Sequence, residues 1–118
     1  FEHSLGDLSR TLKTPLILYV PYFCTENVYK DRYRFVTGYS GQWEFSEPHP
    51  DDALAFYREL FAYGARNGMA GFENDFLNFN HLAMPLFRRS LGSHEKWLAG
   101  IDTAATEHGM PWQMCMAL

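Results

Sequence analysis

Three short apolar segments, separated by segments of helical periodicity, constrain the fold of this chain most strongly. They cover residues 16–20, 69–75 and 112–117. The first is apolar throughout and lies between two prolines, which is typical of a strand buried on both faces. Strands that alternate with helices pair in parallel through right-handed crossovers. The sequence therefore predicts an α/β fold in which these three segments are parallel strands.

Helices are predicted before each strand from periodicity and from start and stop residues. Residues 1–13 have the pattern of a helix tail, with leucines at spacings of three and four. Pro50 and two following acidic residues predict the start of a helix over 50–66. Ser93 is expected to cap a third helix. Gly68 and Gly109 are expected to end the second and third helices.

The connections in the chain differ in length according to their direction. Turns from helix to strand are short, at 67–68 and 109–111. Connections from strand to helix are long, at 21–49 and 76–92. Long loops at the carboxyl ends of the strands are typical of a (β/α)8 TIM-type barrel. A Rossmann sheet is disfavoured because no glycine-rich turn follows a strand.

The two long connections are expected to contain little regular structure. The first is rich in aromatic residues, and a short strand near 34–37 with a turn at 39–42 is predicted within it. The second is predicted to contain one short helix near 84–89. Loops of this length inside a domain are usually functional.

The composition excludes several classes of partner. The 118 residues carry a net charge of −4 with scattered basic residues, which argues against nucleic-acid binding. No apolar run reaches the roughly 18 residues that a membrane span needs. The 17% aromatic content suits either a pocket for sugars or simple core packing. The two cysteines do not make a disulfide framework, but are expected near strand ends.

Asp75, at the end of the second predicted strand, is the leading candidate for a catalytic residue. A carboxylate at this position of a barrel strand acts as a nucleophile, a general base or a metal ligand. The alternatives are a helix cap or an ion pair at the rim. Glu73 lies two residues earlier on the same strand face. Burial and the like charge of the neighbouring carboxylate are expected to raise the pKa of one of these two residues. The alternative for Glu73 is a structural ion pair with a basic residue.

Polar residues beyond Asp75 are candidate binding residues. Asn78, Asn80 and His81 can bond sugar hydroxyls, or they form a turn and a surface loop. The five histidines lack the spacing of a zinc site, and Cys24 has no convincing catalytic partner. No P-loop, nucleophile elbow or dinucleotide fingerprint is present, so neither a cofactor nor a metal site is predicted from motifs.

The order of these features resembles the middle of the catalytic barrel in one clan of retaining glycoside hydrolases, that of α-galactosidases and raffinose synthases. In that clan an apolar strand near a proline precedes a long aromatic loop. A helix then leads through a glycine to a strand that ends in the nucleophilic Asp. Pro15–Val20, residues 21–49, residues 50–66, Gly68 and Asp75 follow that order.

Two further points belong to this resemblance. Cys115-Met116 is similar to a Cys-Met pair on a later strand of the raffinose-synthase branch. The clan's strand usually reads apolar-Lys-x-Asp, whereas this chain reads Phe72-Glu73-Asn74-Asp75. Glu73 thus stands where the clan has a lysine that helps to hold the sugar.

The resemblance implies a glycosidase. Asp75 would attack the anomeric carbon of a carbohydrate substrate, and a second carboxylate about 5–5.5 Å away would protonate the leaving oxygen. That acid/base residue is expected on a later strand, beyond Leu118. Tyr22 and Trp43 would stack on sugar rings. Residues 1–118 would be a fragment of a single catalytic barrel domain, whose remainder is the partner of this segment.

Two other functions stay open at this stage. One is a metal-dependent barrel enzyme that uses Glu73 and Asp75 as ligands. The other is a non-catalytic carbohydrate-binding barrel in which the acidic residues are structural. A fold alone does not distinguish them.

Overall fold

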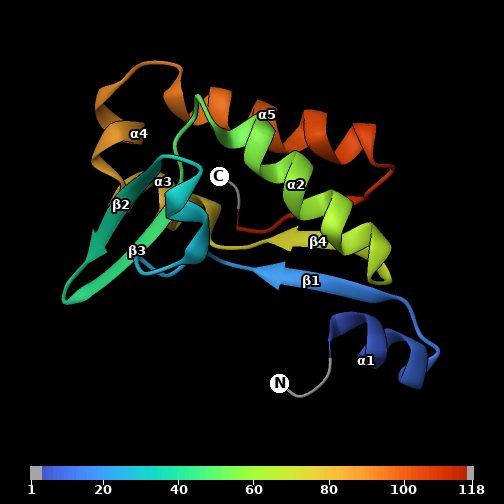
Figure 1. Ribbon diagram of the computed structural model, residues 1–118. Helices are drawn as coiled ribbons and strands as arrows, with labels where there is room; N and C mark the ends of the chain where they lie inside the picture. The colour runs from blue at the N-terminus through green and yellow to red at the C-terminus, as the bar shows by residue number, and fades with distance from the viewer. Residues whose placement is uncertain (1–3, 117–118) are drawn as a thin grey trace.

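A three-stranded parallel sheet lies at the centre of the computed structural model, which describes residues 4–116 (Figure 1). Its strands, in the spatial order β1-β4-β5, are β1 (Leu16–Val20), β4 (Met69–Asn74) and β5 (Trp112–Met114). The three predicted strands and their parallel pairing are confirmed. The range 112–117 was too long, because Met116 has a left-handed φ of 52° that ends the extended conformation. Ala117 and Leu118 lie outside the described residues.

Two long helices cover one face of this sheet (Figure 1). They are α2 (Ala53–Arg66) and α5 (Ser93–Glu107), and they lie side by side. The core between the helices and the sheet is largely aromatic, with Phe56, Tyr57, Phe61, Phe72 and Trp97 almost fully buried. No helix within residues 4–116 is long and apolar enough to cross a lipid bilayer.

The other face of the sheet is open. Tyr19 of β1, Glu73 of β4 and Gln113 of β5 are in register and belong to this face. Ile17 and Tyr19 are 66% and 50% exposed there. Parallel sheets are normally covered on both faces. In the described segment, therefore, the layer formed by α2 and α5 covers one face of the sheet only. The order of the three strands across the sheet is also their order along the chain.

The first long connection contains an antiparallel hairpin that the sequence analysis largely missed. After a 3-10 turn, η1 (Val28–Asp31), the chain forms β2 (Phe35–Ser40) and β3 (Trp43–Pro48). The predicted strand near 34–37 was too short, and the turn is Gly41-Gln42 rather than 39–42. Gly41 has a φ of 61°, which glycine adopts without strain.

The second long connection contains two short helices. The predicted one is confirmed as α4 (Pro85–Arg89), and α3 (Leu77–Ala83) precedes it. The start of α3 carries no recognisable cap, because its first flanking residue, Phe76, is left-handed and makes no side-chain capping bond. This start signal was therefore missing from the sequence.

Three helix starts differ from the sequence prediction. The first predicted segment, 1–13, was expected to be the end of a longer helix. Instead α1 (Leu5–Leu12) starts directly after its N-cap Ser4, which exchanges capping bonds with Asp7. The second begins at Ala53, three residues after Pro50. Ser93 is not a cap, since Gly92 precedes the helix and the Ser93 hydroxyl donates to the carbonyls of Leu86 and Ser90. Residues 1–3 are outside the described part of the chain.

The contact between α2 and α5 is closest at Gly100. A Cβ added to Gly100 would lie 2.9 Å from the Cβ of Ala53 and 2.9 Å from the backbone nitrogen of Leu54. The second of these atoms belongs to the backbone and cannot rotate away. Gly100 is therefore required for the spacing of the two helices, although glycine weakens a helix intrinsically.

We expect Gly100→Ala to lower the free energy of unfolding. Overpacking costs about 1–3 kcal/mol, which exceeds the helix-propensity gain of up to about 1 kcal/mol. Urea denaturation measures the change. Ala99→Leu, at the neighbouring exposed position, is the control and is expected to change stability by no more than about 0.5 kcal/mol. Equal effects of the two variants would contradict the close-packing argument.

Candidate active site

Asp75 follows the last residue of β4, at the carboxyl edge of the sheet, and is bonded by neighbours from two directions. The Tyr19 hydroxyl, from β1, donates to its Oδ2 at 2.9 Å. The Phe76 backbone N–H donates to its Oδ1 at 2.6 Å. Cys115, which follows β5, lies beside it, with its sulfur within 4.8 Å of the carboxylate. All three strands thus contribute to the surroundings of this one side chain.

These neighbours favour the ionised form of Asp75. Burial opposes ionisation, but the Phe76 N–H, the Tyr19 hydroxyl and the nearby Cys115 together outweigh it, so the pKa of Asp75 is below its usual value. Asp75 is therefore not the member of the acidic pair whose pKa is raised. The hydrogen bond to Asp75 raises the pKa of Tyr19, and the same carboxylate raises the pKa of Cys115. Both neighbours thus remain protonated donors at neutral pH.

The backbone is strained at equivalent positions after β4 and β5, two residues beyond the end of each strand. Phe76 has a φ of 58° and Met116 a φ of 52°, both left-handed. Such a conformation is unusual for bulky residues and often occurs at functional sites. The N–H groups of Leu77 and Asn78 donate to the carbonyls of Cys115 and Met116, which links the two turns. These turns place Asp75 and Cys115 next to each other.

Glu73 lies beside Asp75, as its position two residues earlier predicted. The carboxylates of Glu73 and Asp75 and the sulfur of Cys115 offer atoms that all lie within 4.8 Å of one another. Glu73 is half-buried and takes part in no ion pair between residues of the described segment. The alternative of a structural ion pair for Glu73 therefore has no support within residues 4–116.

Tyr22 and Trp43, the predicted sugar-stacking residues, line one small cavity. It has a volume of about 240 Å³ and is formed by Tyr22, Ser40, Trp43, Glu44, Phe45 and Phe79. Trp43 is 76% exposed. Most of the residues that line this cavity come from the β2–β3 hairpin and from α3. The sequence predicted only part of the hairpin and did not predict α3. We call this cavity the hairpin pocket.

Asn78 and His81 do not line the hairpin pocket. The Asn78 side chain accepts a hydrogen bond from the Phe79 N–H. His81 pairs with His94 of α5, with 3.0 Å between their Nδ1 atoms. His94 in turn stacks on Phe87 and Trp97. The side chain of His81 therefore belongs to an aromatic cluster between α3 and α5, and the acidic group at Asp75 does not include it.

A buried polar group supports the carboxyl edge of the sheet. It contains Glu47, which the sequence did not reveal, and Asn80, which was predicted as a sugar-binding or turn residue and is instead fully buried. Glu47 of β3 is fully buried, and its Oε1 accepts a hydrogen bond from Asn80 at 3.1 Å. The Asn80 amide also donates to the Pro21 carbonyl, and Asn74 donates to the Val20 carbonyl. The hairpin and α3 are thus attached to the end of β1. Burial raises the pKa of Glu47 well above its usual range, and hydrogen bonds offset this only in part.

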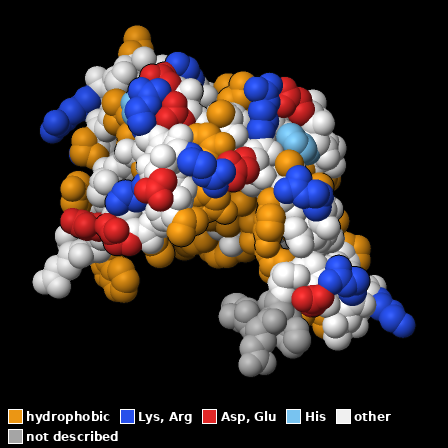
Figure 2. Space-filling view, in the orientation of Figure 1, with side chains coloured by type: hydrophobic (Ala, Val, Ile, Leu, Met, Phe, Trp, Pro, Cys, Tyr) orange, Lys and Arg blue, Asp and Glu red, His pale blue; other side chains and the backbone are white. Residues whose placement is uncertain are grey.

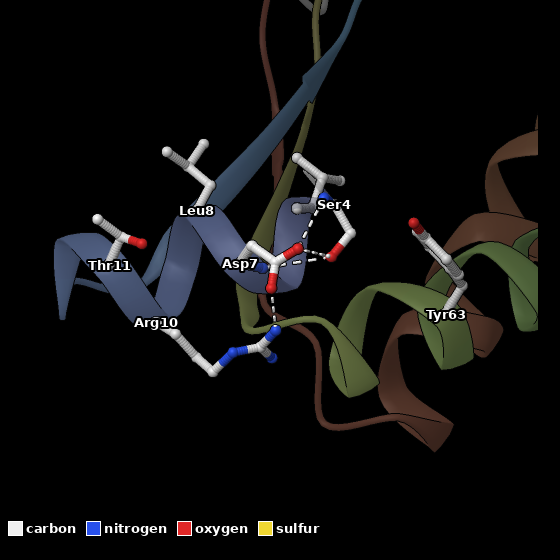
Figure 3. A pocket seen from close by; sticks show the side chains of 7 residues that line it. Ser4, Asp7, Leu8, Arg10, Thr11 and Tyr63 are labelled. Carbon is white, nitrogen blue, oxygen red and sulfur yellow. Dashed lines mark hydrogen bonds and ion pairs between the residues drawn. The ribbon is translucent and has the colours of Figure 1, made fainter. Parts of the chain in front are cut away.

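A larger cavity of about 900 Å³ lies at the opposite end of the sheet. It separates α1 from the end of α2: Figure 3 shows Tyr63 of α2 set apart from α1, with Ser4 and Asp7 on the side of α1 nearer to it. In Figure 2 hydrophobic side chains gather in the hollow between α1 and the main body. α1 contacts the Asn67-Gly68 turn, which precedes β4. This cavity is therefore remote from the strand ends that carry Asp75.

The cysteines are both free thiols: Cys24 is exposed and Cys115 is half-buried. Cys24 follows β1 by several residues and lies outside the strand. Only Cys115 therefore takes part in the site.

Comparison with known proteins gives no family assignment. No protein-family model matches the chain, and no curated protein matches it. The resemblance to glycoside hydrolases accordingly rests on the order of features in the sequence.

We expect Glu47→Gln to stabilise the protein at pH values above the pKa that Glu47 has in the unfolded chain. A carboxyl whose pKa is raised by folding binds its proton more tightly in the native state, so stability falls as pH rises from the unfolded pKa to the folded one. The loss approaches about 1.4 kcal/mol per pH unit. Glutamine keeps the acceptor for Asn80 and cannot ionise. Urea denaturation between about pH 5 and pH 8 should give a flatter profile for the variant.

The control is Glu44→Gln, an exposed residue of the same strand. It should leave the pH profile of stability parallel to that of the unmodified protein. A Glu47→Gln profile that also runs parallel would show that Glu47 is not held as the neutral acid.

Proposed function

We propose that this chain is part of a (β/α)8 barrel of a retaining glycoside hydrolase and that Asp75 is its nucleophile. The observation that carries the proposal is the convergence of Tyr19, Phe76 and Cys115 on the Asp75 carboxylate. A nucleophile must be ionised and fixed in direction before the substrate arrives. The lowered pKa of Asp75 supports the first condition, and its hydrogen bonds with Tyr19 and Phe76 support the second.

The barrel part of the proposal is supported by the topology. The strand order β1-β4-β5 follows the chain, and α2 and α5 cover the same face. In a doubly wound sheet the order reverses and the helices are divided between both faces. Within the described residues β1 and β5 each pair only with β4, so both outer edges are open to further strands. Additional β/α units would close this sheet with the Ile17 and Tyr19 face inside.

The chemistry would follow the two-carboxylate scheme. An Asp75 oxygen attacks the anomeric carbon and forms a glycosyl ester while the bond to the leaving oxygen breaks. An acid/base carboxylate on a later strand protonates that oxygen and then deprotonates the incoming water. Glu73, in place of the clan's lysine, would accept hydrogen bonds from sugar hydroxyls rather than donate them.

The test is Asp75→Asn in the full chain. Loss of the nucleophile is expected to lower glycoside turnover by roughly a thousandfold or more. The melting temperature should change little, because the asparagine carbonyl oxygen can still accept from the Phe76 N–H and its amide nitrogen can donate to the Tyr19 hydroxyl oxygen. Asp31→Asn, an exposed aspartate of η1, is the matched control. Unchanged turnover in Asp75→Asn would refute Asp75 as the nucleophile, whereas the absence of turnover from the unmodified full chain would favour a non-catalytic carbohydrate-binding barrel.

A metal-dependent enzyme is the second candidate, supported by the short separations between Glu73, Asp75 and Cys115. Two carboxylates suit hard cations, whereas a thiol binds metals as the thiolate. The raised pKa of Cys115 argues against its use as a ligand at neutral pH. Activity that survives exhaustive chelation would eliminate this candidate.

A further inference from the structure

Two histidine rings join α3 to α5. The Nδ1 atoms of His81, in α3, and His94, in α5, lie 3.0 Å apart, and the two ring centroids lie 4.7 Å apart. A ring nitrogen donates a hydrogen bond when it carries a proton and accepts one when it does not. The contact is therefore a hydrogen bond only while one of the two Nδ1 atoms is protonated and the other is not.

The surroundings of His94 decide which ring donates. Its Nε2 atom is buried and has no hydrogen-bond partner within residues 4–116. A proton on Nε2 would be a buried donor without an acceptor, which costs about 1–3 kcal/mol. His94 therefore carries its single proton on Nδ1 and donates it to His81. The neutral His81 ring then carries its own proton on Nε2.

Neither ring can become a cation without weakening this contact. A cationic His81 has an N–H at Nδ1, which faces the N–H of His94. Transfer of the His94 proton to Nε2 would restore the bond, but it would bury an N–H without an acceptor. A cationic His94 carries the same buried Nε2–H. The ring of His94 stacks on Phe87 and Trp97, which hold it in place, so its Nε2 cannot turn toward solvent.

The charges around His94 give the direction of the pH effect. Burial lowers the pKa of His94, the nearby His81 ring lowers it further, and Glu95 partly opposes the shift. Arg88 and Arg89, on the adjoining α4, are exposed. His94 therefore binds a proton less readily in the folded chain than in the unfolded one. The stability that the neutral ring contributes is present above the unfolded pKa of about 6.5 and is lost as the pH falls below it.

The attachment of α3 affects both the hairpin and the strand ends. α3 begins two residues after Asp75, and the N–H groups of its first two residues donate to carbonyls of the turn after β5. Asn80, the neighbour of His81, bonds the buried Glu47 of the hairpin. A change in the position of α3 therefore reaches the surroundings of Asp75.

We propose that the hydrogen bond between His81 and His94 is an acid-sensitive attachment of α3, which is intact while both rings are neutral and opens when either becomes a cation. Acidification then frees α3 before α2 and the sheet unfold. The inference is independent of the glycosidase proposal, because neither the contact nor its test involves a substrate.

Amide hydrogen exchange in the full chain, followed by NMR, reports on α3 separately from the rest of the fold. The N–H groups of Asn80 and Met84 donate to the carbonyls of Phe76 and Asn80, and amides within α2 are the internal reference. The measurements use the Glu47→Gln variant, because the raised pKa of Glu47 makes stability change with pH in the opposite direction. Glutamine keeps the acceptor for Asn80.

We expect the protection factors of the α3 amides to fall by about tenfold or more between about pH 7.5 and pH 5.5, the effect of one proton that only the open state binds. The α2 amides should not change. Adding His94→Phe, which keeps an aromatic ring against Phe87 and Trp97, should reduce the fall to less than about twofold, because His81 then titrates unopposed. Adding His108→Asn instead, at the other end of α5, is the control and should leave the fall unchanged.

A second measurement needs no substitution. The ring nitrogen chemical shifts at about pH 7.5 should show His94 protonated at Nδ1 and His81 protonated at Nε2. Any of four results would overturn the proposal. They are a proton on Nε2 in both rings, constant protection of α3 down to about pH 5.5, an undiminished fall in the variant with His94→Phe, and an equal fall in α2.

Discussion

The parallel pairing of β1 with β4 is the interaction on which the rest of the structure depends. Its register sets Leu18 beside Phe72 on the helix-covered face and Tyr19 beside Glu73 on the open face. A slip of one residue would exchange these faces, removing the apolar contacts from α2 and the Tyr19 hydroxyl from Asp75. The same pairing therefore stabilises the core and assembles the candidate site. Asn74 and Asn80 reinforce it by bonding the carbonyls at the end of β1.

The parts of the fold that could be predicted are those with a local signal. The apolar run after Pro15 and the helix stop at Gly68 locate β1 and β4 from a few neighbouring residues. The whole hairpin could not be found in this way, because Glu47 interrupts its apolar pattern, and this residue is buried and bonded to Asn80 of α3. Likewise α3 begins at a left-handed Phe76 with no capping side chain. Tertiary contacts determine both of these segments.

In the candidate site, too, the features with a local sequence signal could be predicted and those that depend on tertiary contacts could not. Sequence spacing was sufficient to place Glu73 and Asp75 together, because side chains two apart on a strand share a face. It could not give the direction of the pKa shift of Asp75, since two of the groups that lower this pKa, Tyr19 and Cys115, lie far away along the chain. Tyr19 is 56 residues away along the chain, and Cys115 comes from the next strand. The effect of burial is outweighed when several donors converge on one carboxylate.

The left-handed turns at Phe76 and Met116 connect this electrostatic arrangement to the fold. Each costs about 1–2 kcal/mol for a residue with a side chain, and neither turn could persist in an isolated peptide. They are held because the parallel ladder between β4 and β5 fixes the residues just before them, and because Leu77 and Asn78 bond across to the second turn. The strain directs Asp75 and Cys115 toward one point at the edge of the sheet. The packing of α2 and α5 on one face of the sheet thus stabilises the left-handed turns that position Asp75 and Cys115.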